Sequence, residues 1–134
     1  MHPFNKILLI DEDRTNNLII QKLTNNLDFT KELSVCSSGQ DALNLLSDLV
    51  VTNEALPDLI FLDIKMPEMD GWEFLKAYKR LKNTIKIEIP ILIVSSSGNP
   101  RDKQKAVDFP EVKGYYEKPL TIAKLEEIKG KYAK

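Results

Sequence analysis

The sequence predicts an α/β fold in which five parallel strands form one doubly wound sheet covered by helices on both faces. Three observations lead to this fold class. Short apolar runs alternate with segments of helical periodicity along the whole chain. The run at 59–62 is apolar at every position, which is typical of a strand buried on both faces of a parallel sheet. Right-handed crossovers between parallel strands restrict the topology further.

The first half of the chain supplies three strands and two helices. We expect strands at 6–10, 31–36 and 58–63, each an apolar or β-prone run. The first helix is predicted from an inward-facing stripe that comprises Leu18, Ile19, Ile20, Leu23 and Leu27. The second helix has apolar residues at i, i+3, i+4 and i+7, namely Ala42, Leu45, Leu46 and Leu49.

The stretch after the third strand contains the turn residues Pro67 and Gly71, and a helix is predicted at 71–81. In the connection at 82–88, isoleucines alternate with polar residues, and we interpret it as an extended edge segment. The fourth strand is predicted at 91–94.

The last part of the chain supplies two helices and one strand. A helix at 101–108 follows an Asn-Pro start signal and has few apolar residues, so we expect it to be the least anchored. A strand is predicted at 113–117. In the final helix, Thr121 is the expected N-cap, and three residues are expected to face inward: Ile122, Leu125 and Ile128.

The bulk properties exclude several classes of protein. At 134 residues the chain is expected to form a single domain, 1–134. A net charge of -1 offers no electrostatic basis for binding nucleic acid or an anionic membrane. Cys36 is the only cysteine and no long apolar span is present, so we expect a cytoplasmic protein. Because His2 is the only histidine, most zinc sites and histidine-dependent nucleophiles are excluded.

Polar residues follow four of the predicted strands. The first ends in acidic residues 11–13, the third in Asp63, the fourth in Ser95 and the fifth in Lys118. With strand order 2-1-3-4-5 the carboxylates converge at one edge of the sheet. Converging carboxylates repel unless a cation is present, and oxygen ligands suit Mg²⁺. The set therefore predicts a magnesium-assisted phosphoryl site in which Asp63 is the attacking carboxylate.

Each of these features also has an ordinary structural explanation. Acidic residues are favoured at helix starts by the macrodipole, serines often end strands as turn formers, and a lysine before proline is usually a surface residue. Their coincidence at one edge favours the functional interpretation.

Four segments of the chain, 7–13, 62–71, 93–96 and 114–119, resemble the receiver domain of two-component response regulators. The Asp-x-x-Met-Pro-x-Met-Asp-Gly string that begins at Asp63 is the most specific of them. The resemblance covers essentially the whole chain and implies a (βα)5 flavodoxin-like fold with Mg²⁺ as cofactor. It also implies a phosphoacceptor rather than a turnover enzyme.

The resemblance assigns roles to residues of the phosphoryl site. Asp63 would accept the phosphoryl group, and Asp11 and Glu12 would bind Mg²⁺ together with Asp63 and the backbone carbonyl of Lys65. Lys118 would pair with the phosphate, ahead of a cis bond to Pro119. The family usually has Asp where this chain has Glu12, which is longer by one methylene.

The resemblance also implies a switch and its partners. Ser95 would bind the phosphoryl group and move on activation, and Tyr115 would turn inward with it. The donor would be a histidine kinase or a histidine phosphotransfer protein. The surface formed by the fourth helix, the fifth strand and the fifth helix would contact a downstream protein or a second copy in a homodimer. The segment 108–112 departs from the family's usual Ala/Gly-rich approach to the fifth strand.

Two alternatives to the phosphoaccepting receiver remain open at this point. One is a receiver-fold binding module that no longer uses phosphate, and the other is a Mg²⁺-dependent phosphatase. In the phosphatase, Asp11 is the nucleophile and Asp13 the acid/base, because 7–15 also fits the motif hhhhDxDxT. The phosphatase leaves the loop that begins at Asp63 unexplained. Which aspartate becomes phosphorylated distinguishes it from a receiver.

Overall fold

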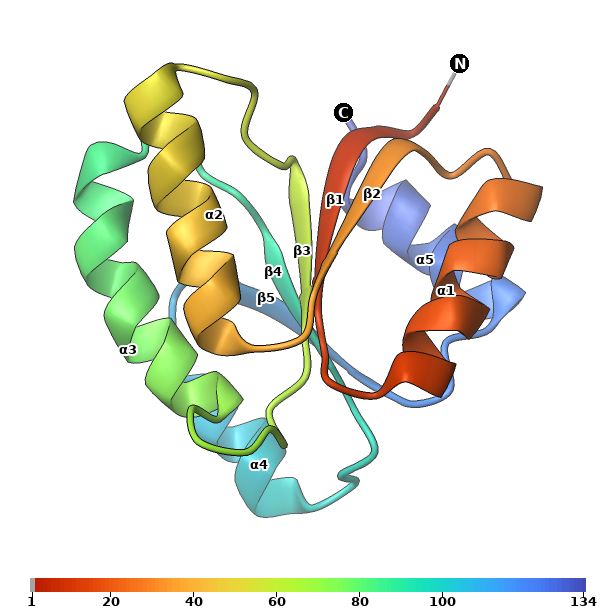
Figure 1. The fold of residues 1–134 in the computed structure, drawn as a ribbon. Helices are drawn as coiled ribbons and strands as arrows, with labels where there is room; N and C mark the ends of the chain where they lie inside the picture. Colours follow the sequence, from red (N-terminus) through yellow and green to blue (C-terminus); the bar gives the residue numbers. More distant parts are fainter. Residues whose placement is uncertain (1) are drawn as a thin grey trace.

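The computed structural model describes residues 2–134 and contains one parallel sheet with the strand order β2-β1-β3-β4-β5 (Figure 1). The predicted fold class and strand order are therefore confirmed. The strands are β1 (Phe4–Ile10), β2 (Thr30–Cys36), β3 (Leu59–Leu62), β4 (Ile91–Ser95) and β5 (Val112–Glu117). The predicted strands begin or end within two residues of these bounds.

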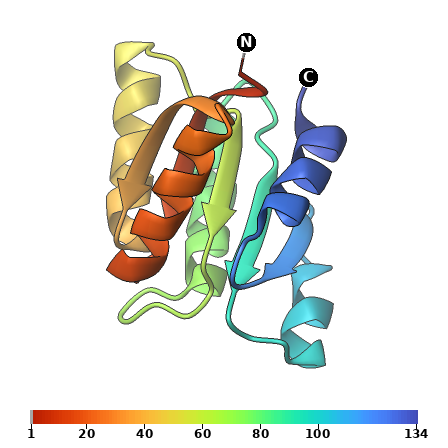
Figure 2. The same cartoon turned by 90° about the vertical axis from the view of Figure 1, so that its right-hand side faces the viewer.

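Helices cover both faces of the sheet. They are α1 (Arg14–Asn26), α2 (Gly39–Thr52), α3 (Gly71–Leu81), α4 (Pro100–Ala106) and α5 (Ile122–Tyr132), with a 3₁₀ turn η1 (Lys82–Thr84) after α3. In Figures 1 and 2, α1 and α5 lie on one face, and α2, α3 and α4 lie on the other. All loops that follow the strands are consequently gathered at the carboxyl edge of the sheet.

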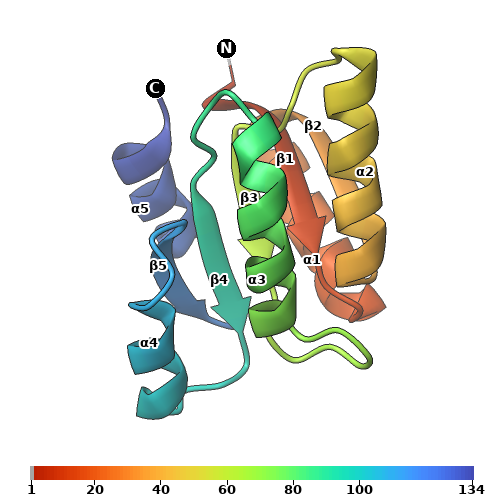
Figure 3. The same cartoon turned by 90° about the vertical axis from the view of Figure 1, so that its left-hand side faces the viewer.

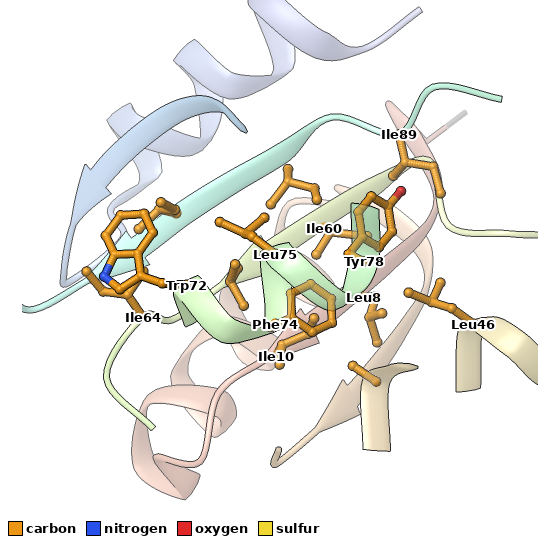
Figure 4. Packing of buried hydrophobic residues seen from close by; sticks show 14 of the residues in the cluster. Leu8, Ile10, Leu46, Ile60, Ile64, Trp72, Phe74, Leu75, Tyr78 and Ile89 are labelled. Atoms are coloured by element: carbon orange, nitrogen blue, oxygen red, sulfur yellow. The ribbon is translucent and has the colours of Figure 1, made fainter. Parts of the chain in front are cut away.

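Two apolar cores flank the sheet, because successive strand residues point to opposite faces. In β1, Leu8 and Ile10 pack under α2 and α3, while Ile7 and Leu9 pack under α1 and α5. Figure 4 shows the core under α3, where Phe74 lies among buried isoleucine and leucine side chains. This burial on both faces explains why β3 is apolar at every position.

The predicted apolar stripe of α1 is wrong in part. Ile20 is buried, but Leu18 and Ile19 are 58% and 46% exposed. The buried positions of α1 include Asn16 and Asn17 instead. Both asparagines are stabilised there by hydrogen bonds to the end of β1, which an apolar stripe does not anticipate.

The connection before β4 does not form the expected extended edge segment. It begins with η1, and β4 already has β3 on one side and β5 on the other, so no edge is free for pairing. The alternating isoleucines reflect alternating burial without strand pairing: Ile85 and Ile89 are buried, whereas Ile87 is exposed. In α5 the inward prediction is correct for Leu125 and Ile128 but wrong for Ile122, which is 55% exposed at the first helical position.

Helix α4 is short and has only one fully buried residue, Ala106. It ends two residues before the predicted boundary, and 107–108 form a turn. The expectation that this helix is weakly anchored agrees with its burial.

The start of α3 packs directly against the loop that follows β3. Asp70 is the N-cap, and its side chain and that of Glu73 form a reciprocal capping box. Gly71 donates its backbone N–H to the carbonyl of Ile64 at 3.0 Å. A Cβ at position 71 would lie 2.6 Å from the Cα of Ile64 and 2.9 Å from the carbonyl oxygen of Asp63.

We therefore expect Gly71→Ala to lower the free energy of unfolding by about 2–4 kcal/mol, because backbone atoms must move to make room. Gly130→Ala is the matched control, since a Cβ at Gly130 meets nothing within 4 Å. This control lies in α5 and should raise the free energy of unfolding by roughly 0.5–1 kcal/mol. Urea denaturation of both variants measures the contrast, and equal stabilities would contradict the packing.

Candidate functional site

Asp11 follows β1 and is 1% exposed. Its carboxylate accepts hydrogen bonds from the backbone N–H of Asp13 at 2.9 Å and from the side-chain amide of Asn16 at 2.9 Å. Its backbone carbonyl accepts a third bond, from the side-chain amide of Asn17 at 2.9 Å. The start of α1 therefore holds Asp11 in one orientation, pointing into the edge of the sheet.

Asp63 follows β3 and is 5% exposed. The register of β3 on β1 sets Asp63 beside Asp11, since Asp63 donates its backbone N–H to the carbonyl of Ile10 at 2.9 Å. The backbone N–H of Lys65 donates to Asp63 Oδ1 at 3.2 Å. A buried carboxylate with a single backbone donor keeps acceptor capacity that the protein does not use.

Lys118 brings a cation to this carboxylate pair from the end of β5. Its backbone N–H donates to the carbonyl of Ser95 at 2.9 Å, and its peptide bond to Pro119 is cis, as predicted. Lys118 Nζ lies 2.7 Å from Asp11 Oδ2 and 3.5 Å from Asp63 Oδ2. One ammonium group therefore bridges both carboxylates, and its shorter contact is with Asp11.

The charges of the three residues shift one another's pKa. Burial, followed by the charge of Asp11, raises the pKa of Asp63 above its ordinary value of 3.8, and Lys118 opposes this only in part. For Lys118, burial favours the neutral amine, but its hydrogen bond and charge interactions with Asp11 dominate and raise the pKa above 10.5. The carboxylates of Asp11 and Asp63 together thus carry more negative charge than Lys118 neutralises.

This shift predicts a pH dependence of stability. Because the pKa of Asp63 is raised in the folded state, the folded protein binds more protons than the unfolded chain between pH 3.8 and the folded pKa. The contribution of Asp63 to stability therefore falls as the pH rises through this window. We expect Asp63→Asn to remove this slope, so its stability gain over wild type grows with pH. Urea titrations of both proteins at several pH values test this, and a gain that shrinks with pH would contradict it.

Ser95 and Tyr115 lie at the same edge, in a network centred on Ser97. Ser95 is fully buried, and its hydroxyl accepts the backbone N–H of Ser97 at 3.2 Å. Tyr115 donates its hydroxyl to the carbonyl of Ser97 at 2.8 Å, and the Ser97 hydroxyl donates to Asp102 of α4. The loop after β4, β5 and α4 are thereby joined through Ser97.

Glu12, a predicted metal ligand, has an exposed side chain. The predicted ligand at position 65 is the backbone carbonyl, so the exposed side chain of Lys65 does not bear on it. Asp13, the acid/base of the alternative phosphatase, caps α1 by accepting the N–H of Asn16. Within residues 2–134, no three acidic, histidine or cysteine side chains are grouped in a way that would hold a metal ion. The two buried carboxylates themselves fit Mg²⁺, which is commonly held by one or two carboxylates, with phosphate and water completing its shell.

Two asparagines of the site are missing from the sequence predictions. Asn16 and Asn17 follow Asp11 by five and six residues, at positions where an amphipathic α1 would carry apolar side chains. Their signal in the sequence was polarity on the inward side of a helix directly after a strand that ends in a carboxylate. One oxygen of Asn17 is buried and has no hydrogen-bond partner in the described structure.

Doubly wound α/β proteins bind their ligands at the carboxyl edge of the sheet. In this chain that edge carries two carboxylates and a lysine. Comparison with known proteins places it more closely: the family model described as the response regulator receiver domain matches residues 7–129, and the chain belongs to this family. Receiver domains are signalling modules of two-component systems.

Three similar proteins illustrate the relationship. A two component response regulator from Cytophaga hutchinsonii has a solved structure that is 31% identical, covers 96% of each chain and superposes with a TM-score of 0.87. The phosphorylated cyanobacterial phytochrome response regulator RcpA is 26% identical, covers 97% of this chain and 91% of that one, and gives a TM-score of 0.72. The probable methanogenesis regulatory protein FilR2 of Methanothrix harundinacea is 29% identical over 92% of this chain.

The chain spans 80% of FilR2 but only 12 to 37% of three other curated relatives. The activities of those longer proteins are therefore not carried over to this chain. Across residues 2–134, no helix combines the length and apolar character needed to cross a bilayer.

Proposed function

We propose that Asp63 accepts a phosphoryl group from the phosphohistidine of a histidine kinase or phosphotransfer protein. The observation that carries this proposal is the position of Asp63, buried beside Asp11 and 3.5 Å from Lys118 Nζ. An Asp63 oxygen attacks phosphorus, the P–N bond of the donor breaks, and the released imidazole nitrogen takes up a proton. The product is an acyl phosphate on Asp63.

Charge neutralisation is the main task of the surrounding residues. Lys118, which bridges the two carboxylates here, would pair with the added phosphoryl oxygens, and the Ser95 hydroxyl would donate to one of them. Asp11, Asp63 and the backbone carbonyl of Lys65 would hold Mg²⁺, with Glu12 as the further acidic ligand. When bound, the metal neutralises charge on the carboxylates and on the transferred group.

The output of the proposed switch lies on the surface formed by α4, β5 and α5. Ser95 and Tyr115 connect the site to this surface through Ser97, which supports their role as switch residues. A downstream protein or a second copy of the chain is the proposed partner there, and nucleic acid is not. Residues 1–134 would form one receiver domain in the cytoplasm, where Cys36, a free cysteine, remains reduced.

The requirement for metal gives the first test of this function. We expect wild-type protein incubated with acetyl phosphate and Mg²⁺ to gain one phosphoryl group by intact mass spectrometry. The same mixture with EDTA should gain none, because Lys118 is then the only described cation that offsets the Asp11 and Asp63 carboxylates and the incoming phosphoryl group. Beryllofluoride binding in the presence of Mg²⁺ is the control for a short-lived adduct. Absence of both would overturn the proposal and favour the phosphate-independent binding module.

A further inference from the structure

Two consecutive asparagines of α1 are buried where an amphipathic helix would carry apolar side chains. Asn16 is 9% exposed and Asn17 is 7% exposed. Asparagine is a poor helix former and buries little apolar surface, so both positions forgo stability that a leucine would supply. Residues that break a local rule in this way are expected at functional sites. Figures 1 and 3 show the start of α1 beside the end of β1, the strand that Asp11 follows.

The two side-chain amides hold different parts of Asp11. Asn16 Nδ2 donates to Oδ2 of the Asp11 carboxylate at 2.9 Å, and Asn17 Nδ2 donates to the Asp11 backbone carbonyl at 2.9 Å. On the other side of the residue, the Asp11 backbone N–H donates to the carbonyl of Cys36 at 3.0 Å. The main chain of Asp11 is therefore fixed between β2 and α1, and its carboxylate is held separately by Asn16.

The orientation of the Asn17 amide carries a cost. A carbonyl oxygen only accepts hydrogen bonds, so Nδ2 of Asn17, and not its oxygen, must face the Asp11 carbonyl. Asn17 Oδ1 is consequently turned away, and it is buried without a hydrogen-bond partner among residues 2–134. Burying a polar atom without a partner is unfavourable, so stability alone does not explain an asparagine at this position.

We propose that Asn17, together with Asn16, is a positioning residue for the metal site and acts through Asp11. This inference rests on the proposed function, in which Asp11 is a ligand of Mg²⁺. Replacing an outer residue that orients a metal ligand typically lowers metal affinity about 10–100-fold. Asn17 gives the cleaner test of the two, because its side chain touches the main chain of Asp11 and not the carboxylate. Its replacement therefore leaves the charge of the carboxylate and the hydrogen bonds that the carboxylate accepts unchanged.

Asn17→Leu should weaken Mg²⁺ binding about tenfold without a matching loss of stability. Thermal unfolding at constant ionic strength measures the binding, as the Mg²⁺ concentration that raises Tm by a fixed amount. The urea midpoint without metal should change by less than about 0.5 M. The reason is that the substitution removes one unpartnered buried oxygen, Asn17 Oδ1, and leaves another, the Asp11 carbonyl, without its donor.

Phosphorylation by acetyl phosphate gives a second readout. The Mg²⁺ concentration for half of the maximal rate should rise about tenfold in Asn17→Leu, whereas the rate at saturating Mg²⁺ should fall less than about threefold. The matched control, Asn25→Leu, makes the same replacement at an exposed position of α1 and should leave Mg²⁺ binding, rate and urea midpoint unchanged. Circular dichroism confirms folding, and Asn17→Ala is measured in the same way if leucine prevents it.

The possible failures can be told apart. Wild-type Mg²⁺ dependence in Asn17→Leu, or a loss of affinity equal to that of Asn25→Leu, would refute the positioning role and leave the proposed function standing. A lower urea midpoint with an unchanged Mg²⁺ dependence would refute it too, since Asn17 would then only support the fold. If Mg²⁺ neither raises the Tm of wild type nor promotes phosphorylation, the proposed function fails and this inference fails with it.

Discussion

Asp63→Asn is expected to abolish phosphoryl incorporation and, at neutral pH, to raise the free energy of unfolding by about 1 kcal/mol. Both effects have one cause. Burial of the Asp63 carboxylate, followed by the nearby charge of Asp11, raises its pKa and disfavours the ionised form. An asparagine oxygen can still accept the N–H of Lys65, so the loop keeps its hydrogen bond while the like charge is removed.

Intact mass spectrometry with acetyl phosphate and Mg²⁺ measures the first effect, and urea denaturation without metal measures the second. Asp48→Asn is the matched control, because Asp48 is an exposed carboxylate of α2. It should leave both quantities unchanged, to within about 0.5 kcal/mol in stability. A less stable Asp63→Asn protein would show that the attraction to Lys118 outweighs the repulsion from Asp11, contrary to the electrostatics of the site.

The second large effect is expected from Lys118→Met. Removing the ammonium leaves two buried carboxylates without their bridging cation, and it should lower the free energy of unfolding by about 2 kcal/mol. This expected loss of stability is smaller than the usual cost of breaking a buried ion pair. The Lys118 side chain is 14% exposed, and Asp63 can take up a proton when the ammonium is lost. Phosphoryl incorporation should slow roughly 100-fold or more, since the group that would face the transferred oxygens is lost.

The stability loss and the rate loss can be separated with a second substitution. Lys118→Met/Asp11→Asn removes one of the two stranded carboxylates and should recover most of the stability but none of the rate. Lys129→Met, at an exposed lysine of α5, is the control for loss of a lysine as such. The account fails if Lys118→Met is as stable as Lys129→Met.

The sequence predicts the fold well because its strands are buried on both faces. The run 59–62 has no polar residue, and Asp63 and the turn residues after it mark where the strand ends. The order of strands and helices can therefore be predicted from apolar periodicity and from the turn residues between the runs. The sheet edge at which Asp11, Asp63 and Lys118 meet then follows from the parallel topology alone.

Other features depend on packing that the sequence pattern does not report. Leu18 and Ile19 are apolar but exposed, whereas Asn16 is polar and buried because it binds Asp11. The sequence likewise does not reveal that Lys118 approaches Asp11 more closely than Asp63. The hydrogen bond of Asn16 to Asp11 and the ion pair of Lys118 with Asp11 are specific polar contacts between elements, which the spacing of apolar residues does not encode.

The central claim is that the carboxylate after β3 carries the phosphoryl group, and mapping the modified residue tests it most directly. Wild-type protein phosphorylated by acetyl phosphate is treated with borohydride, which delivers hydride to the acyl carbon, releases phosphate and converts the aspartyl phosphate to homoserine. Peptide mass spectrometry then locates the new residue. We predict homoserine at position 63. Homoserine at position 11 would contradict the account and show that Asp11 is the nucleophile.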